Sequence, residues 1–234
     1  MLSDKTAIVT GASRGLGRAI ARALAGQHCR VALVARDRTG LEAVAGGIDG
    51  VEARAFPADL SKPEEVDRVL SDIAAWAPVD ILVNNAGLGY YRPFLEHSPE
   101  EHERIVDVNV RAPIRLCQGV LPGMLERGAG HIVNIASDLS FTPLANMAVY
   151  AASKFALRGL SLSLMKEFKD RGVRVSLINP GMIDTAFNDG EEGRLGARSA
   201  LQPDELARVV VDVLTQPGFQ MVDEVTLHAV HQDY

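Results

Sequence analysis

The sequence predicts a doubly wound α/β fold, in which one parallel sheet is covered by helices on both faces. Short apolar runs alternate with longer amphipathic stretches, the pattern of buried parallel strands joined by crossover helices. With 47% hydrophobic residues among 234, the chain can form a packed core, which excludes a disordered or fibrous protein. One domain over residues 1–234 is expected, since α/β folds of this length are commonly single units.

Seven runs are short and apolar enough to be the strands. They are too continuous for half-exposed antiparallel strands, in which polar and apolar residues alternate. We therefore expect about seven parallel strands. They are Ala7 to Thr10, Val31 to Ala35, Val51 to Phe56, Ile81 to Val83, His131 to Ala136, Val173 to Ile178 and Val225 to Leu227.

Helix start signals lie between these runs. Proline in a first turn with acidic residues behind it is typical of a helix N-terminus, and this pattern follows Ser61, Ser98 and Gln202. Regular alternation of strand and helix implies right-handed crossovers. We expect helices at Leu16 to Ala25, Ser61 to Trp76, Pro99 to Leu125, Tyr150 to Lys169, and from Pro203 onward.

One stretch, residues 186–202, has no clear period and is rich in Gly, Glu and Arg. A long irregular segment in a compact domain is often a lid, although a mobile surface excursion is an equal alternative. We expect a flexible substrate loop there.

The charge balance argues against a nucleic-acid partner. The chain has 24 basic and 30 acidic side chains, so its net charge of −6 repels a phosphate backbone.

Two further sequence features bear on location and metal binding. No run approaches the roughly 18 apolar residues of a membrane span, so we expect a cytoplasmic protein. Cys29 and Cys117 have no neighbour at metal-ligand spacing, which predicts inert core thiols and no metal site.

A glycine-rich turn follows the first strand. Glycines allow a tight turn and the close approach of a pyrophosphate to the N-terminus of the next helix. Such a trio alone is weak evidence, and an ordinary strand-to-helix turn is the alternative, but the position favours a dinucleotide site. The residues expected to bind the cofactor here are Gly11, Ser13, Arg14, Gly15, Leu16 and Gly17.

The end of the second strand bears on the choice of cofactor. Ala35 stands where an acid would bind a free ribose 2′-hydroxyl, and Arg36 follows it. Together with Arg14, two guanidinium groups suit a 2′-phosphate, which favours NADP(H) over NAD(H). In the alternative, Arg36 is merely solvated and Asp37 does the work of the acid.

A phenol and an ammonium lie on one helix face, at Tyr150 and Lys154. Lowering a tyrosine pKa from about 10 by roughly three units takes about 4 kcal/mol. An ammonium about 4 Å away supplies that order of energy at an effective dielectric of about 20. Ser137, at the end of the fifth strand, is placed to bond a substrate carbonyl. Singly, each of the three also has an ordinary structural explanation.

Together these residues resemble the short-chain dehydrogenase/reductase family. Thr10-Gly-x-x-x-Gly-x-Gly17 is similar to its cofactor motif, and Asn84-Asn-Ala-Gly87 to its fourth-strand motif. Ser137, thirteen positions before Tyr150-x-x-x-Lys154, resembles its active site. The segment from Asn179-Pro-Gly to Thr185 resembles the part that holds the nicotinamide. The resemblance implies a Rossmann-type fold.

The resemblance also implies roles. Tyr150 is then the general acid of carbonyl reduction, Ser137 polarises the carbonyl, and Lys154 lowers the tyrosine pKa and binds the nicotinamide ribose. Asn109 holds a water in a proton relay, unless it is only a polar residue packed at a helix bend. Asp59 has the alternative of a helix cap, and Asn85 to Gly87 that of a supporting turn. Further cofactor contacts implied by the resemblance are Asp59, Leu60, Asn85, Ala86, Gly87, Pro180, Gly181, Ile183 and Thr185.

Two departures from the family concern the pocket and the subunit interface. Ser140 stands where members often have glycine, and Val225 to Val230 replaces a glycine-rich segment. Mostly apolar pocket walls suit a small or medium carbonyl compound. Arg127 and Arg171 are candidate docking residues for an acidic acyl carrier, as in similar 3-oxoacyl-acyl-carrier-protein reductases. The candidate pocket residues are Leu88, Tyr90, Tyr91, Leu139, Leu144, Met147, Met182 and Phe187.

The sequence thus predicts an NADPH-dependent carbonyl reductase that can run backwards as an alcohol dehydrogenase. A cofactor-sensing protein without turnover is a rival, which the complete serine, tyrosine and lysine set disfavours. An NAD-dependent alcohol dehydrogenase is another, and an epimerase or dehydratase needs a longer substrate domain. The helices Pro99 to Leu125 and Tyr150 to Lys169 correspond to those that build dimers or tetramers in the family, which implies a homo-oligomer.

Overall fold

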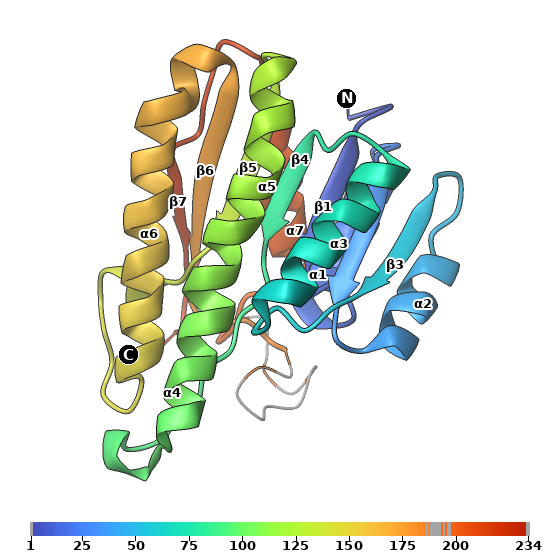
Figure 1. Ribbon diagram of the computed structural model, residues 1–234. Helices are drawn as coiled ribbons and strands as arrows, with labels where there is room; N and C mark the ends of the chain where they lie inside the picture. The colour runs from blue at the N-terminus through green and yellow to red at the C-terminus, as the bar shows by residue number, and fades with distance from the viewer. Residues whose placement is uncertain (1, 186, 188–192, 194, 196–197, 233–234) are drawn as a thin grey trace.

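A parallel seven-stranded sheet forms the centre of the computed structural model, which describes residues 2–185, 187, 193, 195 and 198–232 (Figure 1). The strand order is β3-β2-β1-β4-β5-β6-β7, so the order reverses between β1 and β4. The strands are β1 Thr6–Thr10, β2 Arg30–Ala35, β3 Ala53–Pro57, β4 Ile81–Asn84, β5 Gly130–Ile135, β6 Val173–Pro180 and β7 Glu224–Leu227.

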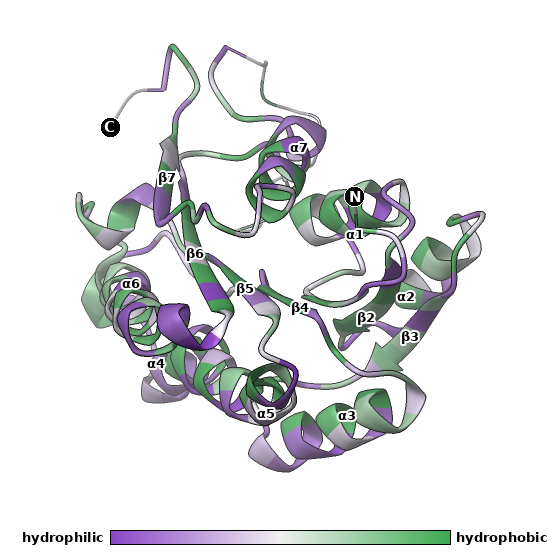
Figure 2. Ribbon diagram, turned by 90° about the horizontal axis from the view of Figure 1, so that it is seen from above, coloured by the Kyte–Doolittle hydropathy of each residue, from purple (hydrophilic) through white to green (hydrophobic). Residues whose placement is uncertain are grey.

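Helices cover both faces of the sheet, and Figure 2 shows α1 and α7 on one side with α3, α5 and α6 on the other. The Rossmann-type arrangement predicted from the alternating pattern is confirmed. The helices are α1 Gly15–Ala25, α2 Arg38–Gly46, α3 Pro63–Trp76, α4 Pro99–Val106, α5 Ala112–Glu126, α6 Ala148–Phe168 and α7 Pro203–Leu214. Short 3₁₀ turns lie at Phe94–Glu96, Asp138–Ser140 and Lys169–Arg171.

Each face of the sheet has its own apolar core. Ala7 and Val9 of β1 pack into the core beneath α1 and α7, whereas Ile8 between them packs into the core beneath α3 and α5. All three side chains are fully buried, because alternate residues of a strand point to opposite faces. Burial on both faces explains why the strands form continuous apolar runs in the sequence.

The largest differences from the sequence predictions lie in peripheral elements. Strand β3 begins at Ala53, two residues later than predicted, because its ladder starts opposite Val31 of β2. Helix α2 was not predicted, since it buries only Leu41 and Val44 and so has a weak apolar pattern. The single helix expected at Pro99 to Leu125 is α4 and α5 joined by a π-helical turn, residues 107–111.

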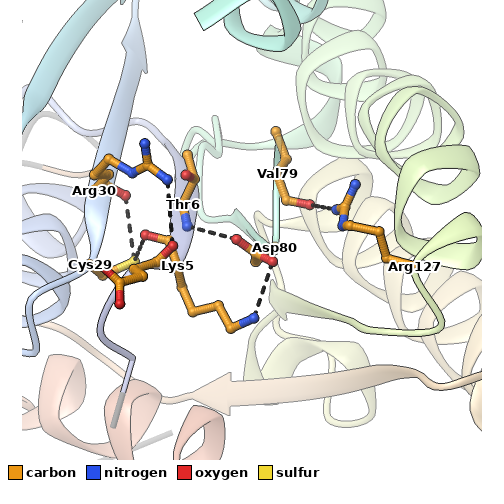
Figure 3. Close-up of polar contacts among 8 residues, drawn as sticks. Lys5, Thr6, Cys29, Arg30, Val79, Asp80 and Arg127 are labelled. Carbon is orange, nitrogen blue, oxygen red and sulfur yellow. Dashed lines mark hydrogen bonds and ion pairs between the residues drawn. The ribbon is translucent and has the colours of Figure 1, made fainter. Parts of the chain in front are cut away.

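The amino ends of the strands form an edge held by polar contacts (Figure 3). The Asp80 carboxylate accepts from the Thr6 amide at 2.9 Å and from Lys5 Nζ at 3.3 Å. The Arg127 guanidinium donates to the Val79 carbonyl at 2.6 Å. The Cys29 thiol lies 3.2 Å from the Lys5 carbonyl oxygen. We call this network the amino edge.

Two sequence predictions concern this edge. Arg127 and Arg171 both precede strands, so they lie at the edge opposite the carboxyl ends of the sheet, and their assignment as docking residues for an acidic acyl carrier stays a prediction. Arg171 lies over the Phe168 ring, 5.7 Å from its centroid. Cys29 and Cys117 are both buried, and burial raises the pKa of each to about 12, as expected of inert core thiols.

Among the described residues, no helix combines the length and the apolar character that crossing a bilayer requires.

Candidate active site

A cleft of about 1190 Å³ opens at the carboxyl edge of the sheet, where the strand order reverses. In parallel α/β sheets, ligands bind at this place. Every residue that the sequence analysis assigned to the cofactor lines the cleft. They are Gly11, Ser13, Arg14, Gly15, Leu16, Gly17, Arg36, Asp59, Leu60, Asn85, Ala86, Gly87, Tyr150, Lys154, Pro180, Gly181, Ile183 and Thr185.

The turn between β1 and α1 requires its glycines. Gly11 and Gly15 have φ angles of +68° and +52°, a region that side chains disfavour. A Cβ at Gly17 would lie 2.2 Å from the Gly11 carbonyl oxygen, so the helix can start here only without a side chain. In the described structure no side-chain hydrogen bond caps the first turn of α1. Its amide groups therefore suit an anion in the cleft, such as the pyrophosphate of a dinucleotide.

Thr10, the last residue of β1, joins this turn to the segment after β4. Its hydroxyl oxygen accepts from the Asn85 and Ala86 amides at 3.0 and 2.9 Å. The Asn85 side-chain amide donates to the Thr10 carbonyl at 2.8 Å. The two strands at the switch point are thus held together on the floor of the cleft. The sequence analysis treated Thr10 only as the start of a motif and missed this contact.

The end of β2 presents a basic side chain to the cleft. Arg36 and Arg14 are both exposed and both line it. Asp37, the competing candidate, also lines the cleft, and its Oδ1 caps the N-terminus of α2 by accepting from the Gly40 amide at 3.0 Å. The two guanidinium groups fit a ribose 2′-phosphate better than a free 2′-hydroxyl.

The three residues predicted for catalysis meet at one point of the cleft. Tyr150 and Lys154 lie on α6, and Ser137 is the second residue after the end of β5. All three are buried, with exposed fractions of 9%, 3% and 7%. The Tyr150 phenol is hydrogen-bonded to Ser137. Lys154 Nζ donates to the Ile135 carbonyl at 2.9 Å and lies 5.5 Å from the centroid of the Tyr150 ring.

Burial dominates the titration of this group. It raises the pKa of Tyr150 above its ordinary value, the Ser137 hydrogen bond opposes that rise, and the Asp138 carboxylate adds to it. Burial also lowers the pKa of Lys154 to about 8. Desolvation of the phenolate dominates the pKa of Tyr150, and the lowering of this pKa by Lys154 stays a prediction. The surrounding side chains favour the phenol, which is the proton-donating form.

The comparisons with known proteins agree with this geometry. A family model described as short chain dehydrogenase matches residues 5–194. This chain belongs to the short-chain dehydrogenase family. It is 35% identical over 230 residues to an uncharacterized oxidoreductase of Staphylococcus epidermidis, covering 98% of this chain and 99% of that protein.

Solved structures of the family superpose closely. An alcohol dehydrogenase from the archaeon Thermococcus sibiricus, complexed with 5-hydroxy-NADP, matches with a TM-score of 0.92 and 35% identity over 98% of each chain. A 3-ketoacyl-(acyl-carrier-protein) reductase from Brucella melitensis, complexed with NADH, matches with a TM-score of 0.89 and 31% identity. The match covers 97% of this chain and 98% of that chain.

Asn109 lies in the π-helical turn between α4 and α5, and it is buried. Its side-chain oxygen accepts from the Leu88 amide at 2.8 Å, and its amide donates to the Leu88 carbonyl and to Ser153 Oγ at 2.8 and 2.9 Å. Asn109 therefore anchors the segment after β4 against α6. These contacts match its description as a packed polar residue, and its role in a proton relay stays a prediction.

The substrate end of the cleft is largely apolar. Tyr90 does not line this cleft. Its ring packs 6.0 Å from the His97 ring, and it lines a smaller pocket with Met147 and Tyr150. The other predicted pocket residues do line the cleft, namely Leu88, Tyr91, Leu139, Leu144, Met147, Met182 and Phe187. Most of the predicted flexible loop lies outside the described residues, at positions 186, 188–192, 194 and 196–197.

Sequence reasoning missed two polar contacts near Ser137. Ser140, where the family often has glycine, donates from its hydroxyl to Asn179 Oδ1 at 3.1 Å and so ties this turn to β6. The second contact is made by Gln232, which lines the cleft and donates from its side chain to Asp138. Gln232 lies far in sequence from the other site residues, so no local sequence pattern could indicate this contact. Asp138 could have been found, since it directly follows Ser137.

Proposed function

We propose that this chain is an NADP(H)-dependent oxidoreductase that reduces a ketone, aldehyde or 3-oxoacyl compound to an alcohol. The observation that carries this proposal is the meeting of Ser137, Tyr150 and Lys154 in the cleft that the glycine turn also lines. Burial keeps Tyr150 in the phenol form that reduction needs. The reverse reaction, alcohol oxidation, needs the phenolate at the same site.

Two arginines support the choice of NADP(H). Arg14 and Arg36 line the adenosine end of the cleft, where a 2′-phosphate needs charge-assisted donors. The alcohol dehydrogenase of Thermococcus sibiricus is complexed with 5-hydroxy-NADP, which agrees with this choice. The Brucella melitensis reductase, complexed with NADH, keeps NAD as the second candidate cofactor.

The side chains divide the chemistry among them. When bound, NADPH supplies the hydride. The carbonyl oxygen gains negative charge during reduction, and the Ser137 hydroxyl stabilises that charge by donating a hydrogen bond. Tyr150 gives its proton to the oxygen as general acid. Lys154 places a positive charge beside the ring and limits the cost of the phenolate that remains.

The apolar walls support a small or medium carbonyl compound as substrate. Leu139, Leu144 and Met147 surround the catalytic groups and exclude water from the reacting carbonyl. A carrier-bound 3-oxoacyl compound is a further candidate substrate, because the similar Brucella melitensis protein is named a 3-ketoacyl-(acyl-carrier-protein) reductase. Arg127 and Arg171, the candidate docking residues for such a carrier, lie at the other edge of the sheet of the same chain.

We also propose a cytoplasmic homo-oligomer, a dimer or tetramer. Large apolar side chains are exposed beside α4 and on α6, where Leu95 is 92% and Phe155 46% exposed. Apolar patches of this kind often mark subunit interfaces. Light scattering of the purified protein at micromolar concentration should give a mass above that of one chain. A monomer would contradict the proposal.

The direct experiment is to follow NADPH and NADH oxidation across a panel of ketones, aldehydes, quinones and 3-oxoacyl thioesters. We expect turnover with NADPH that is lost in Tyr150→Phe. Faster turnover with NADH would contradict the cofactor assignment. Tight NADPH binding without turnover on any member of the panel would favour the cofactor-sensing protein.

A further inference from the structure

A carboxylate lies directly against the catalytic serine. Asp138 begins the 3₁₀ turn after β5 and is only 4% exposed. The Ser137 hydroxyl donates to Asp138 Oδ1 at 2.8 Å and accepts from the Leu139 amide at 3.2 Å. A serine hydroxyl has one proton to donate. In this structure the hydroxyl therefore points at the carboxylate, and Ser137 must rotate its O–H away from Asp138 to donate to a substrate carbonyl.

The other oxygen of Asp138 is bound by the segment after β7. Gln232 donates to Asp138 Oδ2 at 3.0 Å, and His228 Nε2 lies 3.4 Å from the same oxygen. The Gln232 side-chain oxygen accepts from the Met182 amide at 2.8 Å. These contacts hold both carboxylate oxygens in place, so the orientation of Asp138 toward Ser137 is built into the fold.

The charge of Asp138 reaches the general acid. Tyr150 is hydrogen-bonded to Ser137, so phenol, hydroxyl and carboxylate form a short chain. A second negative charge nearby disfavours the phenolate, and Asp138 accordingly raises the pKa of Tyr150 beyond the effect of burial. The elements around Asp138 carry the following charged and titratable groups: Tyr150, Lys154, Arg158, Lys166 and Glu167 on α6, Arg174 on β6, Glu224 on β7, and His228 after it.

We propose that Asp138 is a positioning residue that acts through Ser137 to keep Tyr150 protonated, extending carbonyl reduction toward alkaline pH and delaying alcohol oxidation. The inference rests on the proposed function. Reduction needs the phenol, whereas oxidation needs the phenolate. Asp138 leaves the overall equilibrium unchanged, and it moves only the pH range in which each direction is fast.

Asp138→Asn removes the charge while its amide oxygen still accepts from Ser137. Its amide nitrogen then faces the Gln232 donor, so this variant also loses the Gln232 contact, which the control variant removes alone. We would measure kcat/KM against pH for NADPH-dependent reduction and for NADP⁺-dependent oxidation. At alkaline pH, kcat/KM falls for reduction and rises for oxidation, and the midpoints of both changes should shift to a pH lower by about one unit. At a pH below the wild-type midpoint, kcat/KM for oxidation by Asp138→Asn, expressed as a fraction of its value at high pH, should then be up to about tenfold higher than the same fraction for the wild type. Unmoved profiles would overturn the proposal.

Gln232→Leu is the matched control. It removes the tie between Asp138 and the loop after β6 but leaves the carboxylate charge in place. We expect its pH limbs to coincide with those of the wild type, even where its maximal rate is lower. Equal shifts in both variants would mean that the tie matters and the charge does not, which would also overturn the proposal.

A spectroscopic titration separates this inference from the proposed function. Tyrosinate absorbance is titrated in the NADP⁺ complex, and the curve of the matching Tyr150→Phe protein is subtracted to isolate Tyr150. The midpoint should be lower by about one unit when Asp138 is replaced by Asn. An unchanged midpoint overturns the inference whatever the turnover. A lowered midpoint in a protein that turns over no carbonyl overturns the proposed function and supports the action of Asp138 on Tyr150.

Discussion

The two edges of the sheet use polar side chains in opposite ways. At the amino edge, Lys5, Asp80 and Arg127 bond one another or the backbone, and they hold strands together (Figure 3). At the carboxyl edge, Ser137 and Tyr150 are gathered around a cleft of about 1190 Å³. The difference follows from chain direction, because right-handed β-α units bring helix N-termini, with their positive dipole ends, to the carboxyl edge alone. Anion binding and chemistry can therefore be built there while stability is secured at the other end.

The strongest test of this contrast compares two glycines. Gly17→Ala puts a Cβ 2.2 Å from the Gly11 carbonyl oxygen, whereas Gly46→Ala, at the end of α2, meets nothing within 4 Å. Overpacking costs about 1–3 kcal/mol. Because the strain lies in the turn that we expect to bind the cofactor, the same free energy should weaken NADPH binding by about 10- to 100-fold. Fluorescence titration of NADPH measures it.

Gly46→Ala should leave the NADPH affinity unchanged, and the free energy of unfolding should stay the same or rise by up to about 1 kcal/mol. Equal losses of affinity in the two variants would show that the glycine turn has no special relation to the cofactor.

A second test sharpens the cofactor assignment at the carboxyl edge. Arg36→Ala removes a charge-assisted bond to a 2′-phosphate, worth about 1.5–3 kcal/mol. The KM for NADPH should rise by about 10- to 100-fold while that for NADH stays within about twofold. Steady-state kinetics with both cofactors checks this. Equal changes for the two would mean that Arg36 does not contact the phosphate.

The parts of the fold and of the candidate site that could be predicted are those that leave a local pattern in the sequence. Fully buried strands and the glycine turn leave continuous, local signals, so the sheet and the cofactor residues could be read from the sequence. Contacts between distant segments leave none, which is why the Gln232 contact with Asp138 was missed. The position of Tyr90 outside the main cleft could not be predicted, because residue type does not report which face of the fold a side chain reaches.

The free energy of unfolding should depend on pH through a buried histidine near the amino edge of the sheet. His131, near the start of β5, is buried against Ser176 at 2.8 Å, and burial lowers its pKa to about 3. The unfolded chain binds a proton at this histidine below about pH 6.5 and the folded chain does not, so stability falls as the pH drops through that value. Between pH 7 and 5.5, the wild type should lose about 1 kcal/mol more unfolding free energy than His131→Gln.

Urea denaturation at a series of pH values measures that difference. Turnover of His131→Gln at pH 7 should match the wild type, because the histidine lies away from the cleft. Parallel stability curves for the two proteins would show that this buried imidazole is not the group that titrates.

The central claim is that the carboxyl edge performs the chemistry and the amino edge provides stability. The most direct measurement determines kcat for NADPH-dependent reduction and the free energy of unfolding in both Tyr150→Phe and Asp80→Asn. Tyr150→Phe should lower kcat by about 10²- to 10⁴-fold with little change in stability. Asp80→Asn should cost about 1–2 kcal/mol of stability and leave kcat within about twofold. Turnover that survives in Tyr150→Phe, or that collapses in Asp80→Asn, would contradict the account.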